Sequence, residues 1–298
     1  MKPRVCLSIG NTGLSGVYDA IDFAKSKDVE FIELRFDMIA ETARLNRMNG
    51  KSGDNSYAGS AGGNFDEESV LSEIKKIISY AKDKGIKTIG TNRDASYGSN
   101  KCVSFLEKQR FAKPVDLADL NVIEKKSGSG MVEPERIKFL RSVIELGIGI
   151  CDIEMDILER NVIKNFIEFA HSKKSQVILS VHDFNGRIDL LDAVKYYIDS
   201  SYFGADYFKL TDAVVSEEDA EGVSEKNIKI RSIKMTDEAV FPEFIVFGMG
   251  GKGRITRALS VIYGSYLAYC SSPYGITAPG QLPPDEFYKT VGFLGTLT

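Results

Sequence analysis

The stretch QVILSVHDFNGRIDLLDAVKYYIDSSYFGADYFKL, residues 176–210, contains the unit from which the fold is built. A short apolar run covers 176–181, apolar residues at helical spacing follow in 190–198, and a second apolar run covers 206–210. A strand, a helix and a second strand in this order are typical of a βαβ unit, in which the two strands run parallel.

Strand and helix patterns alternate in the same way along the rest of the chain. Strands are expected at 4–9, 30–36, 87–91, 149–155, 176–181, 206–210, 243–247 and 265–269. Helices with an apolar stripe are expected at 66–84, 134–147 and 190–198, the last with Leu190, Leu191, Val194, Tyr197 and Ile198 on its packed face. Eight strands separated by helices predict an α/β protein of the (β/α)8 TIM barrel type, with a closed parallel sheet inside a ring of helices.

The composition is that of a globular protein, with 298 residues of which 43% are hydrophobic and 27% charged. Barrels of this length are commonly single domains, so we expect one (β/α)8 barrel domain over residues 1–298. The segment 48–64 is rich in Gly, Ser and Asn and is expected to form a flexible loop within that domain. Residues 114–132 are expected to form a second, longer excursion.

The charge and the apolar runs limit the classes of partner. The formal net charge of -4 gives no reason to expect nucleic acid, which usually binds a basic face, so a small molecule is the better expectation. No run approaches the roughly 18 apolar residues of a membrane span, and the N-terminal residues lack a signal core. We therefore expect a cytoplasmic protein with no membrane partner. The four cysteines lie far apart, without metal-ligand spacing, and predict no metal site.

His182 and Lys209 lie near the carboxyl ends of two neighbouring predicted strands, the end where barrel enzymes have their active sites. A lysine inside an apolar strand either forms a buried salt bridge or has its pKa lowered by burial, so that the neutral amine attacks a carbonyl and forms an imine. The second interpretation is favoured here. Position alone is equally compatible with a structural and a catalytic role for His182. The other histidine, His171, falls at the end of a helical pattern and is expected to be solvated.

Three further polar residues, Glu33, Arg35 and Arg93, also lie at the ends of predicted strands and indicate a polar pocket at that end of the barrel. The donor fork of arginine suits a carboxylate or a hydroxyl group. A salt bridge with Glu33 or Asp37 is the alternative for these arginines.

A G-x-G-x-x-G pattern follows the predicted strand 243–247, with Gly248, Gly250 and Gly253. Nicotinamide dinucleotide binding is not expected, because the pattern comes too late for a Rossmann half and no acidic residue ends a second strand about twenty residues later. Two explanations remain: backbone donors that face an anionic ligand, or a tight turn from strand to helix.

Several motifs occur together in strand order. They are ELRFD at 33–37, TNRD at 91–94, DIEMD at 152–156, LSVHDF at 179–184, ADYFKL at 205–210, GMGGKGRITRALSVIYGS at 248–265 and APGQLP at 278–283. This ordered set covers nearly the whole chain and resembles the type I 3-dehydroquinate dehydratases, a family of lyases.

The resemblance implies a hydro-lyase of the shikimate pathway that needs no cofactor. Lys209 would form a Schiff base with the C3 carbonyl of 3-dehydroquinate. His182 would remove a proton from C2 and protonate the departing C1 hydroxyl, which yields 3-dehydroshikimate. The family also implies a homodimer.

The resemblance assigns substrate contacts as well. Arg257, with Gln281 and Thr277, would hold the substrate carboxylate. The strand-end residues Glu33, Arg35 and Arg93 would contact substrate hydroxyls or orient one another, and Ser8 at the end of the first strand is a weaker candidate.

Two departures from the family pattern bear on the catalytic histidine and on the loops. Tyr97 stands where the family has a glutamate that orients the histidine, and Asp183 or Glu154 is expected to compensate for the missing carboxylate. Threonine replaces serine at 256 and 277, which preserves the hydroxyl group, and the segments 48–64 and 114–132 are insertions.

Two alternative functions stay open at this point. One is another Schiff-base barrel, such as a class I aldolase, which would need a phosphate site in the late loops. The other is a catalytically silent barrel that binds a small carboxylate.

Overall fold

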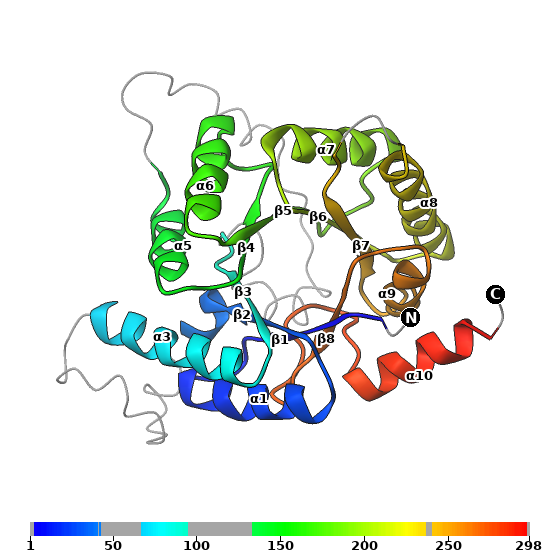
Figure 1. Cartoon of the computed structure of the whole chain (residues 1–298). Coiled ribbons are helices and arrows are strands. Elements are labelled where there is room, and N and C mark those ends of the chain that lie inside the picture. Colours follow the sequence, from blue (N-terminus) through cyan, green and yellow to red (C-terminus); the bar gives the residue numbers. More distant parts are fainter. Residues whose placement is uncertain (1–2, 41, 43–66, 95–132, 237–239, 297–298) are drawn as a thin grey trace.

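The structure is a computed structural model that describes residues 3–40, 42, 67–94, 133–236 and 240–296. Within these residues, a ring of strands is surrounded by helices (Figure 1). The strands are β1 (Val5–Ile9), β2 (Phe31–Arg35), β3 (Lys87–Thr91), β4 (Ile150–Glu154), β5 (Gln176–Asp183), β6 (Tyr207–Ala213), β7 (Glu243–Met249) and β8 (Ala268–Ser271). The helices are α1 (Leu14–Ser26), α3 (Glu67–Asp83), α5 (Glu135–Glu145), α6 (Arg160–Ser172), α7 (Leu190–Phe203), α8 (Glu217–Lys234), α9 (Arg254–Ile262) and α10 (Pro284–Leu294).

The strands form one parallel sheet in the order β7-β6-β5-β4-β3-β2-β1-β8. A backbone hydrogen bond from Tyr266 N–H to the Phe244 carbonyl, 2.7 Å long, connects the segment that enters β8 to β7. The sheet therefore curves into a nearly closed ring, and the predicted (β/α)8 TIM barrel is confirmed.

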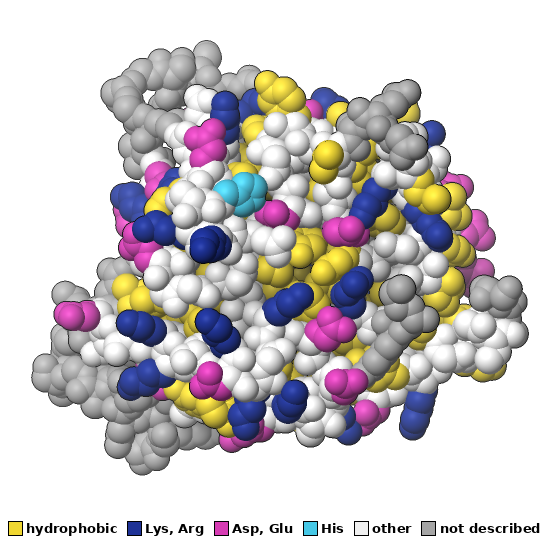
Figure 2. Space-filling model, in the orientation of Figure 1, with side chains coloured by type: hydrophobic (Ala, Val, Ile, Leu, Met, Phe, Trp, Pro, Cys, Tyr) yellow, Lys and Arg dark blue, Asp and Glu magenta, His cyan; other side chains and the backbone are white. Residues whose placement is uncertain are grey.

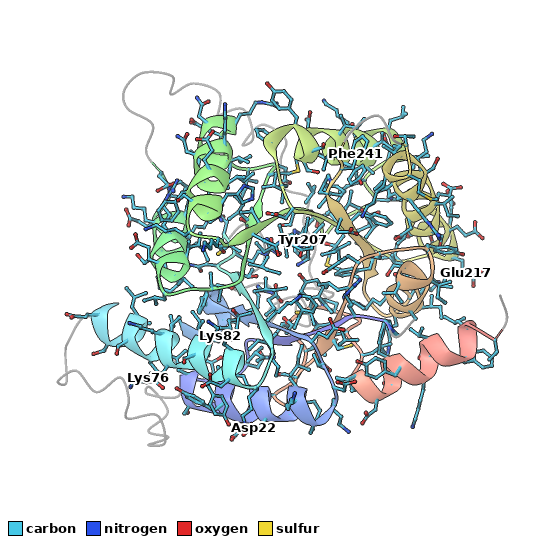
Figure 3. The ribbon with its side chains drawn as sticks, viewed as in Figure 1. Asp22, Lys76, Lys82, Tyr207, Glu217 and Phe241 are labelled. Carbon is cyan, nitrogen blue, oxygen red and sulfur yellow. The ribbon has the colours of Figure 1, made fainter. Side chains whose placement is uncertain are left out.

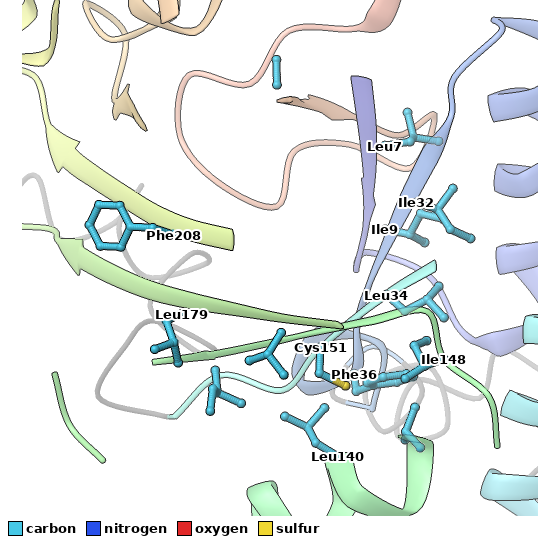
Figure 4. Packing of buried hydrophobic residues seen from close by; sticks show 14 of the residues in the cluster. Leu7, Ile9, Ile32, Leu34, Phe36, Leu140, Ile148, Cys151, Leu179 and Phe208 are labelled. Atoms are coloured by element: carbon cyan, nitrogen blue, oxygen red, sulfur yellow. The ribbon is translucent and has the colours of Figure 1, made fainter. Parts of the chain in front are cut away.

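Strands β1, β2 and β4 are buried along their whole length, because helices cover one face of the sheet and the barrel interior covers the other. The larger apolar cluster lies between sheet and helices, and Figure 4 shows part of it, with Leu7, Ile32, Leu140 and Phe208. A smaller cluster fills the barrel interior, where Tyr207 lies inside the ring of strands (Figure 3).

Helices α3 and α5 bury the stripes that the sequence predicts, including Ile74, Ile77, Leu140 and Val143. For α7 the predicted face is wrong in large part. Leu191 is 80% exposed and Ile198 is 48% exposed, while Ala193, Tyr197 and Ser200 are buried. The helix has apolar residues on two faces, and packing against the barrel buries the face that carries Ala193, Tyr197 and Ser200.

The eighth strand begins later than the predicted range 265–269, at Ala268. Gly264 has φ of 108°, and the Ser265 N–H donates to the Ser260 carbonyl, so these residues still belong to the turn that leaves α9. The Ser265 hydroxyl accepts a hydrogen bond from the Val246 N–H, which explains a polar residue in an otherwise apolar run.

Several predictions made from the sequence lie outside the described residues. They concern Tyr97, Cys102 and the loops expected at 48–64 and 114–132. The cysteines Cys6, Cys151 and Cys270 are buried free thiols.

The described helices include none that is both long enough and apolar enough to cross a membrane. On the face shown in Figure 2, the described Lys and Arg side chains alternate with Asp and Glu. This face therefore lacks, among its described residues, the continuous basic surface that nucleic acids bind.

Candidate active site

Strands β2, β4, β5 and β8 end in a polar residue at their carboxyl ends. On β5 the inward positions are Ile178, Ser180 and His182, and Lys209 on β6 is the Cα partner of Ser180. Because side chains alternate along a strand, residues two positions apart point to the same side. His182 and Lys209 therefore share the barrel interior, one layer apart, at the end where barrel active sites lie.

These polar side chains surround one cavity. Eight of the nine residues that the sequence analysis selected line it: Glu33, Arg35, Arg93, His182, Lys209, Arg257, Thr277 and Gln281. The cavity is also lined by residues that the sequence analysis did not select: Phe184, Thr211, Phe247, Met249, Tyr269 and Ala278.

Ser8, the ninth selected residue, is buried beside the cavity. Its hydroxyl donates to Glu33 Oε2 and lies 2.6 Å from the Thr277 hydroxyl, which donates to it. Thr91 also donates to Glu33, at 2.9 Å. The Glu33 carboxylate is thus held by hydroxyl groups from both neighbouring strands, and Ser8 acts as part of that support.

Lys209 is 4% exposed, and its amine points into the interior. The Nζ atom lies 3.0 Å from Asp152 Oδ2 and 3.9 Å from Glu33 Oε1. The ring of Tyr269 lies on another side of the amine, with its centroid 4.1 Å from Nζ. The salt bridge considered from the sequence is therefore present, and the same amine also lines the cavity.

Asp152 connects the lysine to Arg93. It accepts hydrogen bonds from the Lys209 amine, the Arg93 guanidinium and the Ser180 hydroxyl. Burial alone would raise the pKa of Asp152, but the charges of Arg93 and Lys209 outweigh it and hold this pKa below its ordinary value. Asp152 is therefore a carboxylate near neutral pH. Its inward position on β4, two residues after Ile150, is the signal that the sequence analysis missed.

The two arginines near the mouth have carboxylate partners. Arg93 contacts Asp152 and lies 3.6 Å from Glu154, and Arg35 pairs with Asp37 at 2.8 Å. The salt-bridge alternative is correct for Arg35. Both guanidinium groups nevertheless line the cavity, so each is a fixed cation that can also contact a ligand.

The His182 ring is buried, and its pKa lies well below the ordinary value. Burial is the largest cause, and the cations Arg93 and Lys209 act in the same direction. The imidazole is therefore neutral near pH 7 and can accept a proton. Phe184 stacks parallel to it, with ring centroids 5.9 Å apart and an interplanar angle of 8°.

The carboxylates expected to compensate for Tyr97 bind other groups. Asp183 accepts the backbone N–H groups of its own turn at 2.8 and 2.9 Å. Glu154 accepts from the Arg136 guanidinium and from the Asp94 N–H. The carboxylate whose charge favours protonation of His182 is instead Asp152.

Arg257 is a buried cation of a different kind. It is 1% exposed, donates to the carbonyl of Pro279 at 3.0 Å, and faces the Phe247 ring at 4.4 Å. No carboxylate lies within ion-pair distance of it in the described part of the chain, and burial lowers its pKa to about 10. The amide of Gln281 and the hydroxyl of Thr277 line the same cavity. An anionic ligand would supply the missing counter-charge.

The glycines at 248–253 form the turn that carries Arg257 into place. Gly250 has φ of 90°, and a Cβ atom on Gly253 would lie 2.6 Å from the Met249 carbonyl oxygen. The N–H groups of Gly250 and Gly253 donate to the carbonyls of Pro279 and Gly250. Because these N–H groups donate to backbone carbonyls, the glycines are better explained by a tight turn than by the binding of an anionic ligand.

Known proteins resemble this chain in sequence and in fold. A 3-dehydroquinate dehydratase of Coxiella burnetii (strain Dugway 5J108-111) is 28% identical over 155 residues, which cover 51% of this chain and 60% of that protein. One from Alkaliphilus oremlandii (strain OhILAs) is 30% identical over 155 residues, which cover 52% of this chain and 58% of that protein. The chain thus spans about three fifths of the length of these curated relatives.

The fold has matches among solved structures. A crystal structure of 3-dehydroquinate dehydratase from Geobacillus kaustophilus HTA426 superposes with a TM-score of 0.71 at 19% identity, over 100% of this chain and 93% of that chain. This likeness supports the barrel fold. The model of the family called type I 3-dehydroquinase matches residues 5–298, and the chain therefore belongs to the type I 3-dehydroquinase family.

Proposed function

We propose that this protein is a 3-dehydroquinate dehydratase, a hydro-lyase that converts 3-dehydroquinate to 3-dehydroshikimate through a Schiff base on Lys209. The observation that carries the proposal is the combination, around one cavity, of a buried lysine amine, a neutral imidazole and the guanidinium of Arg257, which has no carboxylate partner among the described residues. The amine and the imidazole suit imine chemistry at a ketone, and the guanidinium suits a carboxylate.

The substrate carboxylate would bind Arg257, with further hydrogen bonds from Gln281 and Thr277. In the free protein, Gln281 Nε2 donates to the Thr277 hydroxyl at 3.1 Å, so these groups already support each other. Glu33, Arg35 and Arg93 would contact the ring hydroxyls. Their side chains are already held in position by Ser8, Thr91, Asp37 and Asp152, so substrate binding requires less reorganisation of the site.

The reaction begins when Lys209 passes a proton to a neighbouring base and the neutral Nζ attacks the C3 carbonyl. The proton then returns to the former carbonyl oxygen, which leaves as water, and the nitrogen becomes a protonated imine. Its positive charge draws electrons from C2 and makes the C2 proton more acidic. Asp152, ionised and 3.0 Å from Nζ, would hold the amine in place during these steps, since its lowered pKa makes it a poor proton acceptor.

His182 would then remove the C2 proton. The neutral state of its imidazole suits this step, since a protonated ring has no lone pair to offer. The imidazolium formed would return a proton to the C1 hydroxyl, which leaves as water. Hydrolysis of the imine releases 3-dehydroshikimate and restores the lysine.

A spectrophotometric dehydration assay tests the proposal, because the product contains a conjugated enone that absorbs and the substrate does not. Borohydride added in the presence of 3-dehydroquinate should reduce the imine and add ligand mass to the Lys209 peptide. If neither the absorbance nor the adduct appears, the proposed function is wrong.

The same proposal covers the state of the protein. We propose that residues 1–298 form one barrel domain and that the protein is a cytoplasmic homodimer. It would need no cofactor, and its ligand would be the small-molecule substrate. Exposed apolar side chains along α7, such as Leu191 and Tyr202, support an association surface. Light scattering of the full chain measures the oligomeric state, and a monomeric mass at micromolar concentration would contradict the dimer.

A further inference from the structure

Tyr269 on β8 is the aromatic neighbour of the reactive amine. Its ring centroid lies 4.1 Å from Lys209 Nζ, and the side chain is 3% exposed. The ring is fixed by a tilted contact with Phe247, at 5.9 Å between centroids. At this distance and degree of burial, a cation on the nitrogen interacts with the negative face of the ring without competition from water.

The condensation of Lys209 with a ketone changes what the nitrogen can offer its neighbours. The ammonium has three N–H groups, which suit the carboxylates of Asp152 and Glu33 at 3.0 and 3.9 Å. When the imine forms, the ketone oxygen leaves as water with two of these hydrogens. The protonated imine keeps the full positive charge but has one N–H group, so it can donate to only one acceptor, and Asp152 at 3.0 Å is the carboxylate within hydrogen-bond distance.

An aromatic face does not need an N–H group, because it interacts with charge rather than with a directed hydrogen. The contact of Tyr269 with the nitrogen therefore persists when the ammonium becomes a protonated imine, and it is lost when the imine is neutral. We propose that the Tyr269 ring stabilises the protonated Schiff base of Lys209 relative to the neutral imine, and thereby keeps the reactive intermediate protonated. The inference rests on the proposed function and deepens it.

The hydroxyl group of Tyr269 is not required for this role. The Oη atom is buried and has no hydrogen-bond partner among the described residues. Burial, with the nearby Glu33 carboxylate, raises the pKa of Tyr269 well above its ordinary value, so the phenol stays neutral and the ring carries no charge of its own. Phenylalanine at this position would keep the electrostatic contact and lose only an unsatisfied group.

The experiment compares variants of the full chain in borohydride trapping with saturating 3-dehydroquinate, followed by mass measurement of the Lys209 peptide, because borohydride reduces the protonated imine. Tyr269→Phe should trap at a rate within about twofold of the wild type. Phenylalanine carrying one, two or three ring fluorines, introduced at position 269, keeps the shape and weakens the negative face stepwise. The trapping rate should fall with each fluorine, and Tyr269→Leu should fall about thirtyfold, the factor for a desolvated cation–π contact.

Tyr207→Leu is the matched control. Tyr207 belongs to the same apolar cluster inside the barrel, contacts Tyr266 and Gln176, and lies outside the lining of the cavity. This variant should unfold at a lower temperature than the wild type. The trapping rate of the protein that remains folded should not change. If Tyr269→Leu does not fold, the fluorinated series still decides the matter.

The inference would be overturned if the trapping rate did not change along the fluorinated series, or if Tyr269→Leu trapped ligand as fast as the wild type. Either result would leave the proposed function intact. A wild-type protein that traps no ligand at Lys209 would instead remove the proposed function, and with it this inference. A Tyr269→Phe variant that loses trapping would also overturn it, because the effect would then belong to the hydroxyl.

Discussion

Lys209 Nζ and Asp152 Oδ2 lie 3.0 Å apart inside the barrel, on strands β6 and β4, which are separated by β5. Both side chains are almost completely buried, and Asp152 also binds Arg93. Asp152 is thus the nearest carboxylate to both buried cations, while Glu33 and Glu154 lie farther away, at 3.9 Å from Lys209 and 3.6 Å from Arg93.

Asp152→Asn should destabilise the protein strongly, because it leaves Lys209 and Arg93 buried without their shared counter-charge. The expected loss in the free energy of unfolding is about 3–5 kcal/mol, measured by urea denaturation. Asp285→Asn is the control, since Asp285 pairs with Lys27 at 2.6 Å on the surface with its side chain 60% exposed. That exposed pair should contribute less than about 1 kcal/mol, and equal losses in the two variants would contradict the account.

His182→Ala should separate binding from turnover. The imine can still form without the imidazole, so borohydride should trap ligand on Lys209, but proton transfer should slow by about 10²–10⁴-fold. His171→Ala serves as the control, because His171 pairs with Asp206 at 2.9 Å at the end of α6, outside the cavity lining. Unaltered turnover in His182→Ala would refute the assignment of the base.

Arg257→Gln should weaken substrate binding more than it weakens the fold. The buried guanidinium has no carboxylate partner among the described residues, so removing its charge should leave the free energy of unfolding unchanged or slightly higher. The KM should rise by about 100-fold, as expected for the loss of charge-assisted hydrogen bonds to a carboxylate. Arg254→Gln, which removes an exposed pair with Glu286, should leave KM unchanged. A stable Arg257→Gln variant with an unchanged KM would show that the carboxylate binds elsewhere.

The lowered pKa of His182 predicts how stability depends on pH. Below the ordinary value of 6.5, the unfolded chain binds a proton at this residue while the folded chain does not. The unfolded state then holds more protons, so stability falls as pH decreases through this window, by up to about 1.4 kcal/mol per pH unit. Asp156 acts in the opposite direction, because desolvation of its carboxylate raises its pKa to about 6.

Urea denaturation of the wild type and of His182→Gln at pH 7.5 and 5.5 isolates the histidine, since Asp156 contributes equally to both proteins. The variant should lose less stability on acidification by about 1 kcal/mol. An identical loss in both proteins would mean that His182 is protonated in the folded state.

The alternation of strand and helix patterns determined the barrel, and eight of the nine selected residues do line one cavity. His182 and Lys209 were accessible to sequence reasoning because each lies near the carboxyl end of an apolar strand, a position that depends only on residues close by in the chain. The buried apolar stripes of α3 and α5 could be predicted for the same reason, because each depends only on the spacing of residues within one helix. In α7 two faces satisfied the same helical spacing, and only packing against the barrel selected Ala193 and Tyr197.

The tertiary structure alone decided which charges meet. Asp152 lies 57 positions before Lys209, and Tyr269 lies 60 positions after it, so both contacts depend on strand register and on the curvature of the sheet. Local propensity sets which residues form strands, but not which side chains converge inside a closed ring, because that convergence depends on the packing of all eight strands at once. For the same reason, only the folded chain shows that Arg257 is left without a carboxylate among the described residues.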